Sequence, residues 1–303
     1  MSKQLSSNKL STIGDYLNYA FLKLKEQRVY CGHGTDNHWD EAVYLVFSCL
    51  GLPLDSERSI LVEPVAEQSG IALLAQINKR IHPRIPVAYL NNRVFFAGLE
   101  FYLDQRTIIP RSPIAELIMN RFDPWVTSSK VKRILDLGTG CGCIAISAAL
   151  AFPKTTVDAV DISLAALEVA KINCQKHQVS DRVNLILSDL FANIEGVEYD
   201  IIVSNPPYVG ESEEKTLPKE YFHEPRSALI AGVRGDEIIT RIMDQAVNFL
   251  APDGILVVEV GNSFALVENR YSKLPLLWLE FEHGVGEVFL VTKKQLLALV
   301  INE

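Results

Sequence analysis

The second part of the sequence alternates short apolar runs with longer stretches of helical periodicity. Such runs are typical of buried strands, and the stretches between most of them are long enough for helices. Strands that alternate with helices predict an α/β fold, a mostly parallel sheet covered by helices on both faces. The last run closely follows another strand-like run and is expected to join the sheet antiparallel. The strand-like runs are residues 133–137, 156–160, 183–187, 200–203, 254–260, 278–281 and 288–292, and the helical stretches are 143–151, 164–177 and 236–250.

The residues before this region have a different pattern. Apolar residues recur at helical spacing, Thr12 and Asp15 are spaced as a capping box, and Gly51 is a typical helix stop. Strand-forming residues on both sides of a glycine predict a hairpin over residues 94–103. The predicted helices span residues 10–24, 40–47, 64–81 and 114–122. We therefore expect a helical domain over 1–92, a β-hairpin linker over 93–112 and an α/β domain over 113–303.

The composition restricts the partners and the compartment. The formal net charge is -8, with the acidic excess in residues 101–303, so the chain favours a basic partner over a phosphate backbone. Its 5 cysteines are scattered and show neither a disulfide framework nor zinc-ligand spacing, which indicates a reducing compartment and no metal. The polar N-terminus lacks the apolar core of a signal peptide, and no apolar run is long enough to cross a bilayer. We expect a cytoplasmic protein without a membrane partner.

A glycine-rich turn follows the first strand of the α/β region. Gly138, Gly140 and Gly142 stand between residues 133–137 and the next helical stretch, where glycine lets the backbone approach a ligand closely. A dinucleotide fingerprint needs a glycine where this chain has Cys143. The spacing instead resembles the S-adenosylmethionine loop of class I methyltransferases.

Acidic residues stand near the ends of the first three strands of this region. The resemblance implies that Asp161 accepts hydrogen bonds from the ribose hydroxyls, that Asp189 borders the adenine amino group and that Asp136 lies near the methionine ammonium group. Asp161 could instead cap the following helix, although Ser163 is the better candidate for that cap. Asp158 is predicted to face solvent from its strand.

The fourth strand ends in Asn205-Pro206-Pro207-Tyr208. An amide nitrogen is a poor nucleophile, so a site that methylates it has to orient its lone pair. Asn205 can accept one hydrogen of the amide through its side-chain oxygen, and the carbonyl of Pro206 can accept the other. The two prolines stiffen the turn, and Tyr208 can stack on the flat amide or on a base. The alternative is a plain proline turn with Tyr208 packed in the core.

These motifs together resemble the Asn-Pro-Pro-Tyr methyltransferases that act on glutamine side-chain amides. That family combines a helical N-terminal domain, a linking hairpin and a class I, Rossmann-like domain, and the resemblance covers essentially the whole chain. Its two best-known bacterial branches act on peptide-release factors and on large-subunit ribosomal protein three. The segment 110–117 departs from the Pro-Arg-Pro-Glu-Thr-Glu of the release-factor branch and looks like the ribosomal-protein branch. Residues 223–225, 258–263 and 278–281 also resemble that branch.

The resemblance assigns roles to particular residues. Asn205, Pro206, Pro207 and Tyr208 are implied as the catalytic residues that hold the glutamine. The mouth of the pocket would be lined by Pro110 and Arg111, although Arg111 could equally form an ion pair at a domain interface. The residues implied in cofactor binding are Asp136, Gly138, Thr139, Gly140, Cys141, Gly142, Asp161, Asp189, Leu190 and Asn205.

The expected function is transfer of a methyl group from S-adenosylmethionine to the N5 nitrogen of a glutamine in large-subunit ribosomal protein three, with S-adenosylhomocysteine as the second product. We expect the free protein or an assembly intermediate to be the substrate, and the helical domain to dock it. Methylation of release factors is the first alternative. Adenine-N6 methylation of nucleic acid uses the same motif, but this acidic chain has no basic recognition segment and is not expected to bind DNA directly. A ribosome-assembly module with incidental methylation is a further alternative.

Overall fold

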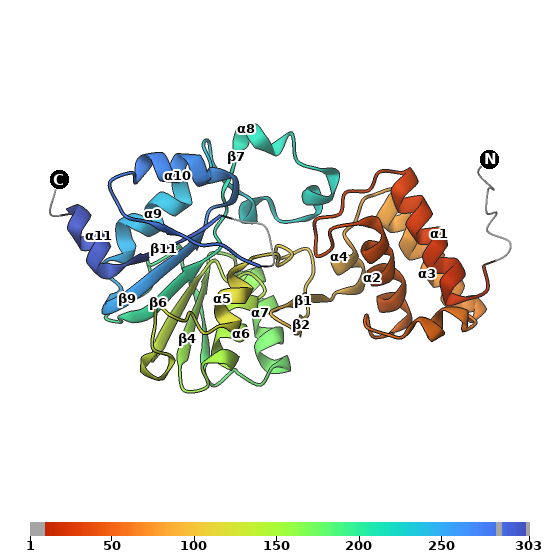
Figure 1. Cartoon of the computed structure of the whole chain (residues 1–303), viewed down its shortest axis with the longest axis horizontal. Helices are drawn as coiled ribbons and strands as arrows, with labels where there is room; N and C mark the ends of the chain where they lie inside the picture. The colour runs from red at the N-terminus through yellow and green to blue at the C-terminus, as the bar shows by residue number, and fades with distance from the viewer. Residues whose placement is uncertain (1–9, 283–286, 301–303) are drawn as a thin grey trace. The chain divides into compact units, whose positions relative to one another are not determined.

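The computed structural model describes residues 10–282 and 287–300 and divides into two compact units. The first unit comprises Met1–Arg93 and Pro218–His223, and the second comprises Val94–Leu217 and Glu224–Glu303. Figure 1 labels their helices and strands. The short segment 218–223 therefore belongs to the first unit although it lies far from it in sequence. The domains expected from the sequence were continuous and placed this segment in the α/β domain.

The first unit is helical. Its helices are α1 (Ile13–Glu26), α2 (His38–Leu50), α3 (Glu67–Ile81) and α4 (Val87–Asn91), with the 3-10 turns η2 (Arg58–Val62) and η4 (Lys219–His223). The predicted capping box is confirmed, since the Thr12 side chain and the Asp15 side chain each accept the other residue's backbone N–H. Gly51 ends α2 in the left-handed conformation. The apolar core of the unit includes Leu17, Leu24, Leu45, Leu73 and Ile77.

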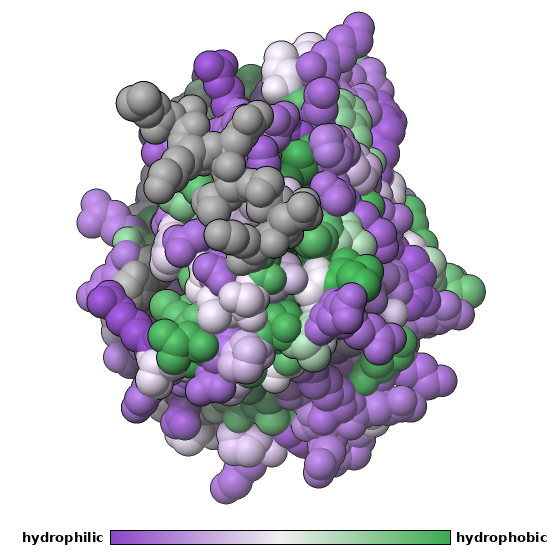
Figure 2. Space-filling model, turned by 90° about the vertical axis from the view of Figure 1, so that its right-hand side faces the viewer, coloured by the Kyte–Doolittle hydropathy of each residue, from purple (hydrophilic) through white to green (hydrophobic). Residues whose placement is uncertain are grey.

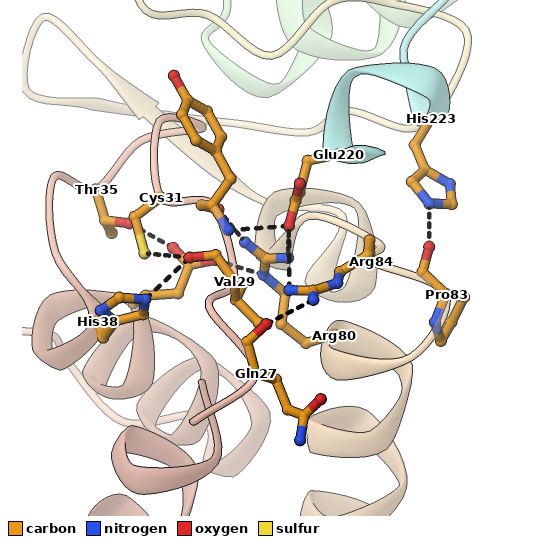
Figure 3. A network of polar contacts seen from close by, with 12 residues as sticks. Gln27, Val29, Cys31, Thr35, His38, Arg80, Pro83, Arg84, Glu220 and His223 are labelled. Carbon is orange, nitrogen blue, oxygen red and sulfur yellow. Dashed lines mark hydrogen bonds and ion pairs between the residues drawn. The ribbon is translucent and has the colours of Figure 1, made fainter. Parts of the chain in front are cut away.

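A buried ion-pair network holds η4 in this first unit. Arg80 on α3 is fully buried, and its guanidinium contacts Glu220 at 3.2 Å (Figure 3) and Glu41 at 2.6 Å. The ring of His223 lies 2.6 Å from the carbonyl oxygen of Pro83 (Figure 3). A buried arginine without carboxylate partners would be strongly destabilising, so these contacts fix the segment 218–223 against α3.

The surface of the chain interleaves apolar and polar side chains on the face that Figure 2 presents. Exposed apolar residues in the first unit include Val62 and Ile71. Single exposed apolar residues of this kind are normal on a protein surface. Within residues 10–282 and 287–300, no helix has the length and apolar character needed to cross a membrane.

The second unit begins with the predicted hairpin. Strands β1 (Val94–Phe96) and β2 (Leu99–Phe101) pair antiparallel, and Gly98 has a φ of +75° in the turn between them. The next helix, α5 (Ile114–Met119), ends three residues earlier than the sequence pattern suggests.

The core of the second unit is a sheet of seven strands with the order β10-β11-β9-β6-β3-β4-β5. The pairs β9-β6, β6-β3, β3-β4 and β4-β5 are parallel, whereas β11 pairs antiparallel with both β9 and β10. The expected mostly parallel sheet with an antiparallel last strand is confirmed. The strands are β3 (Arg133–Leu137), β4 (Thr156–Asp161), β5 (Val183–Leu187), β6 (Tyr199–Ser204), β9 (Leu250–Glu259), β10 (Leu277–Trp278) and β11 (Val288–Thr292).

Helices cover both faces of this sheet, as Figure 1 shows. Helices α6 (Cys143–Ala151) and α7 (Leu164–Lys176) contact β3, β4 and β5. Helices α9 (Glu237–Ala246), α10 (Phe264–Arg270) and α11 (Lys293–Val300) contribute residues to an apolar cluster that also contains residues of β3, β6 and β9. Helix α9 is shorter than the predicted helical stretch 236–250, because β9 already begins at Leu250. A small parallel pair, β7 (Val209–Gly210) and β8 (Ile230–Gly232), and the short helix α8 (Glu211–Glu214) lie beyond β6 in sequence.

Asp158 does not face solvent, so that prediction is wrong. The residue is 3% exposed, and its side chain accepts hydrogen bonds from the hydroxyl of Tyr199 and the amide of Asn184, each at 2.7 Å. Arg133 forms an ion pair with it at 2.8 Å. These partners belong to β3, β5 and β6 of the same sheet, so the side chain of Asp158 has its hydrogen bonds inside the protein rather than to water.

Candidate functional site

A cavity of about 410 Å³ opens at the carboxyl ends of β3, β4, β5 and β6. The chain order reverses at β3, which has β4 on one side and β6 on the other. Ligands of open α/β sheets bind at such a switch point, outside the carboxyl ends of the strands. Its walls include both the glycine-rich turn and the residues that follow β6.

The glycine-rich turn has a conformation that few other residues could adopt. Gly138, Gly140 and Gly142 have φ values of +75°, +56° and +83°. The backbone amides of Gly138 and Thr139 both donate to the carbonyl of Val160 at 2.8 Å, which fixes the turn against β4. Gly138 and Gly140 line the cavity, whereas Thr139, Cys141 and Gly142 are not part of its lining. Those three residues shape the turn from outside the cavity.

Asp136 lies beneath this turn and is fully buried. Its Oδ2 atom accepts hydrogen bonds from the Thr139 hydroxyl at 2.6 Å and from the Ala145 backbone amide at 3.1 Å. Its Oδ1 atom has no hydrogen-bond partner among the described residues. Burial raises the pKa of this carboxyl to about 7. The residue does not line the cavity itself.

Asp161 links the end of β4 to the glycine-rich turn and lines the cavity. One carboxylate oxygen accepts the Gly140 amide at 2.9 Å, and the other accepts the Ser163 amide at 2.9 Å. Burial raises the pKa of this carboxyl, against the effect of these hydrogen bonds. The hydroxyl of Ser163 accepts the Ala166 amide and caps α7, as the sequence predicted. Asp161 is therefore not the side-chain cap of that helix.

Asp189 and Leu190 line the cavity after β5. The Asp189 carboxylate forms an ion pair with Arg241 of α9 at 2.8 Å, and both side chains are partly exposed. Leu190 has a positive φ of 51°, and its carbonyl accepts the Ser188 hydroxyl at 2.9 Å. Arg241 also lines the cavity, a position that the sequence alone did not reveal because α9 is distant in the chain.

The residues after β6 form another part of the cavity wall. Asn205, Pro206 and Pro207 line the cavity, and the hydroxyl of Ser204 donates to the Leu137 carbonyl at 2.7 Å. This bond holds the end of β6 beside the start of the glycine-rich turn. The two motifs found in the sequence therefore meet in one cavity.

Tyr208 is partly buried against the core of the sheet and is not part of the cavity lining. Its hydroxyl donates to Glu259 at 3.3 Å. Pro110 and Arg111 are also outside the lining. Arg111 instead forms two hydrogen bonds to the carboxylate of Glu224, at 2.6 and 2.9 Å. Both residues of this ion pair lie in the second unit. Glu224 directly precedes Pro225 to Ala228 in sequence, and these residues form a further part of the cavity wall.

Comparison with known proteins points to methyl transfer. The model of the methyltransferase small domain matches residues 115–233. The chain is 44% identical to the ribosomal protein uL3 glutamine methyltransferase of Neisseria gonorrhoeae (strain ATCC 700825 / FA 1090), over 96% of this chain and 98% of that protein. It is also 44% identical to the protein of the same name from Neisseria meningitidis serogroup B, over 96% of both chains.

Among solved structures, the hMettl16 catalytic domain in complex with MAT2A 3'UTR hairpin 6 has a TM-score of 0.51 and 16% identity, covering 75% of this chain and 81% of that chain. At that identity the likeness concerns the fold alone.

Proposed function

Because the chain belongs to the family of ribosomal protein uL3 glutamine methyltransferases, we propose that it transfers a methyl group from S-adenosylmethionine to the side-chain nitrogen of a glutamine in uL3, large-subunit ribosomal protein three. The observation that carries this proposal is that Gly138 and Gly140 line the same cavity as Asn205 and Pro206. The glycine-rich turn suits an adenosyl cofactor and the residues after β6 suit a planar amide, so both reactants would meet in one cavity.

The residues around the cavity fit this cofactor. A Cβ atom at Gly138 would meet nothing within 4 Å, so the backbone is open to close approach there. The unpartnered Oδ1 of Asp136 is a buried acceptor near the turn and would balance the positive ammonium group of the methionine part. Asp161 and Asp189 would bind the ribose and border the adenine, and Leu190 would lie beside the ring. The bound cofactor supplies an electrophilic methyl group on a sulfonium.

The amide site would act by orientation. The Asn205 side-chain oxygen would accept one N–H of the glutamine amide and the Pro206 carbonyl would accept the other. With both hydrogens held, the nitrogen lone pair points at the methyl carbon. The amide nitrogen so held would take the methyl group and lose one proton to water, and the cofactor would leave as S-adenosylhomocysteine. Pro206 and Pro207 keep this turn stiff before the substrate binds.

The substrate would be free uL3 or an assembly intermediate, in the cytoplasm, because a target glutamine is less accessible in a completed ribosome. The acidic excess of the chain suits a basic ribosomal protein. Better methylation of mature ribosomes than of free uL3 would contradict this timing.

A methyl-transfer assay with labelled S-adenosylmethionine tests the function. Purified uL3, a release factor and a nucleic acid are offered separately, and mass spectrometry locates the label. We expect label on a glutamine of uL3, its loss with Asn205→Ala, and no loss with Asn120→Ala, a matched change at an exposed asparagine. Label on the release factor would keep the chemistry and replace the substrate. Label on nucleic acid alone would favour adenine methylation instead.

A further inference from the structure

Glu259 is a buried carboxylate that the reaction described above does not use. It is the last residue of β9 and is 2% exposed. The hydroxyls of Ser112 and Tyr208 both donate to it. Glu259 therefore joins three segments that are far apart in sequence, including the residue that ends the Asn-Pro-Pro-Tyr motif.

Residues 259, 261 and 263 hold Tyr208 at three different points. Glu259 accepts the phenol hydroxyl, and the Ser263 hydroxyl donates to the Tyr208 carbonyl at 2.9 Å. The ring packs against Gly261, where a Cβ atom would lie 2.4 Å from a ring carbon. Gly261 also has a φ of +43°, so a larger residue there would be strained as well as crowded. Ring, hydroxyl and main chain of Tyr208 are thus all fixed by one short segment.

Ser112 supports Glu259 from the other side. Its hydroxyl donates to the carboxylate and accepts the Ile114 amide at 3.2 Å, which ties it to the start of α5. The preceding residue, Arg111, binds Glu224 at the beginning of the cavity wall formed by Pro225 to Ala228. Arg111 therefore contacts Glu224, which adjoins one part of the cavity wall. Ser112 contacts Glu259, which binds the tyrosine next to another part of that wall.

We propose that Glu259 is a positioning residue for the amide site, which acts by fixing Tyr208 and, through the main chain, the Asn205–Pro207 wall. This inference rests on the proposed function, because it assumes that this wall holds the glutamine. A buried carboxylate carries a large desolvation penalty, and an apolar side chain would fill the same space without it. The value of the carboxylate is directional, because it accepts hydrogen bonds that set the orientation of the Tyr208 phenol.

The test combines Glu259→Leu and Glu259→Gln with Tyr208→Phe in a double-mutant cycle. Leucine leaves the phenol without its acceptor, so we expect kcat/KM for uL3 to fall about 10- to 100-fold. Glutamine keeps an acceptor and should restore most of this loss. The affinity for S-adenosylmethionine, measured by calorimetry, should stay unchanged. In the Tyr208→Phe background, Glu259→Leu should have little further effect, because the interaction is already absent.

Glu268→Leu, at an exposed position of α10, is the matched control and should retain full activity. Thermal unfolding of each variant shows whether it is folded, and Ser112→Ala offers a milder change if Glu259→Leu unfolds. If Glu259→Leu lowers kcat/KM equally in the wild type and in the Tyr208→Phe variant, the proposal is overturned, since Glu259 would then act independently of Tyr208. Failure of glutamine to restore activity would also contradict it.

A second readout separates this proposal from the proposed function. The Cζ carbon of Tyr208, labelled with ¹³C and assigned by Tyr208→Phe, reports the hydrogen bond of the phenol without any methyl transfer. If the wild type methylates no uL3, the proposed function fails. A Tyr208 signal that shifts with Glu259→Leu and returns with Glu259→Gln would still support the positioning contact. A signal that is the same in all three proteins would overturn it.

Discussion

Two sets of buried carboxylates, one taken from each unit, are stabilised in different ways. In the first unit, Glu41 and Glu220 both contact the buried guanidinium of Arg80 (Figure 3 shows the contact with Glu220). In the second unit, Asp136 and Glu259 accept hydrogen bonds from hydroxyl and amide groups instead. Burial raises the pKa of each of these two acids to about 7. A carboxylate matched by an internal cation serves the fold, whereas one held by neutral donors near a cavity can serve a ligand or a neighbouring residue.

Arg80→Met should have the largest effect. It leaves Glu41 buried without its cation and Glu220 with only Arg84, 3.8 Å away, and breaking a buried pair in this way costs about 3–5 kcal/mol of folding free energy. Urea unfolding measures this loss. Arg58→Met, at an exposed position, should change stability little. Adding Glu41→Gln and Glu220→Gln to Arg80→Met should recover part of the loss, because no carboxylate that Arg80 had paired then remains buried. An unchanged unfolding midpoint for Arg80→Met would show that the network does not stabilise the unit.

Asp136→Asn should lower the affinity for the ligand and leave the folding stability intact, the reverse of what is expected for Arg80→Met. The amide removes the negative charge beneath the glycine-rich turn, near which the cofactor's ammonium group would lie, so we expect the affinity for S-adenosylmethionine to fall about 10- to 100-fold. Folding stability should stay the same or rise, because a desolvated acid is removed. Calorimetry and thermal unfolding measure the two quantities, with exposed Asp181→Asn as the control. A protein that loses stability but binds the cofactor normally would place Asp136 with the structural carboxylates.

The sequence predicted what local pattern controls and missed what distant partners control. Continuous apolar runs located the strands, and the positive φ of Gly138 and Gly140 suits the glycine turn predicted from their spacing. The burial of Asp158 could not be predicted, because its partners come from other strands. Glu220 is 140 positions away from Arg80, so neither residue indicates the other. The motif that contains Glu259 was visible, but its contact with Tyr208 needs the folded sheet.

The raised pKa of Asp136 predicts how the affinity for S-adenosylmethionine depends on pH. The ionised carboxylate binds an ammonium group, so affinity for S-adenosylmethionine should rise by about tenfold between pH 6 and pH 8 as this group loses its proton. Asp136→Asn should remove the dependence. The effect on folding has the opposite sign. The folded state keeps a proton that the unfolded chain releases near 3.8, so this contribution to stability is complete below that pH and is lost as pH rises through about 7. A flat affinity profile in the wild type would contradict the assignment.

Glu220→Gln should have the smallest effect and gives the finest test of the comparison. Arg80 keeps Glu41 as a charged partner, and the glutamine oxygen can still accept the hydrogen bonds now made by Arg80 and by the Tyr30 amide. We therefore expect a loss of about 1 kcal/mol in folding free energy, in the range of an ordinary hydrogen bond, and unchanged affinity for S-adenosylmethionine. The exposed Lys219 offers a local measurement, since loosening of η4 should speed tryptic cleavage there. Glu220→Gln could instead weaken binding of the cofactor as strongly as Asp136→Asn. The paired carboxylates of the first unit would then also contribute to ligand binding, and the contrast between the two kinds of buried acid would fail.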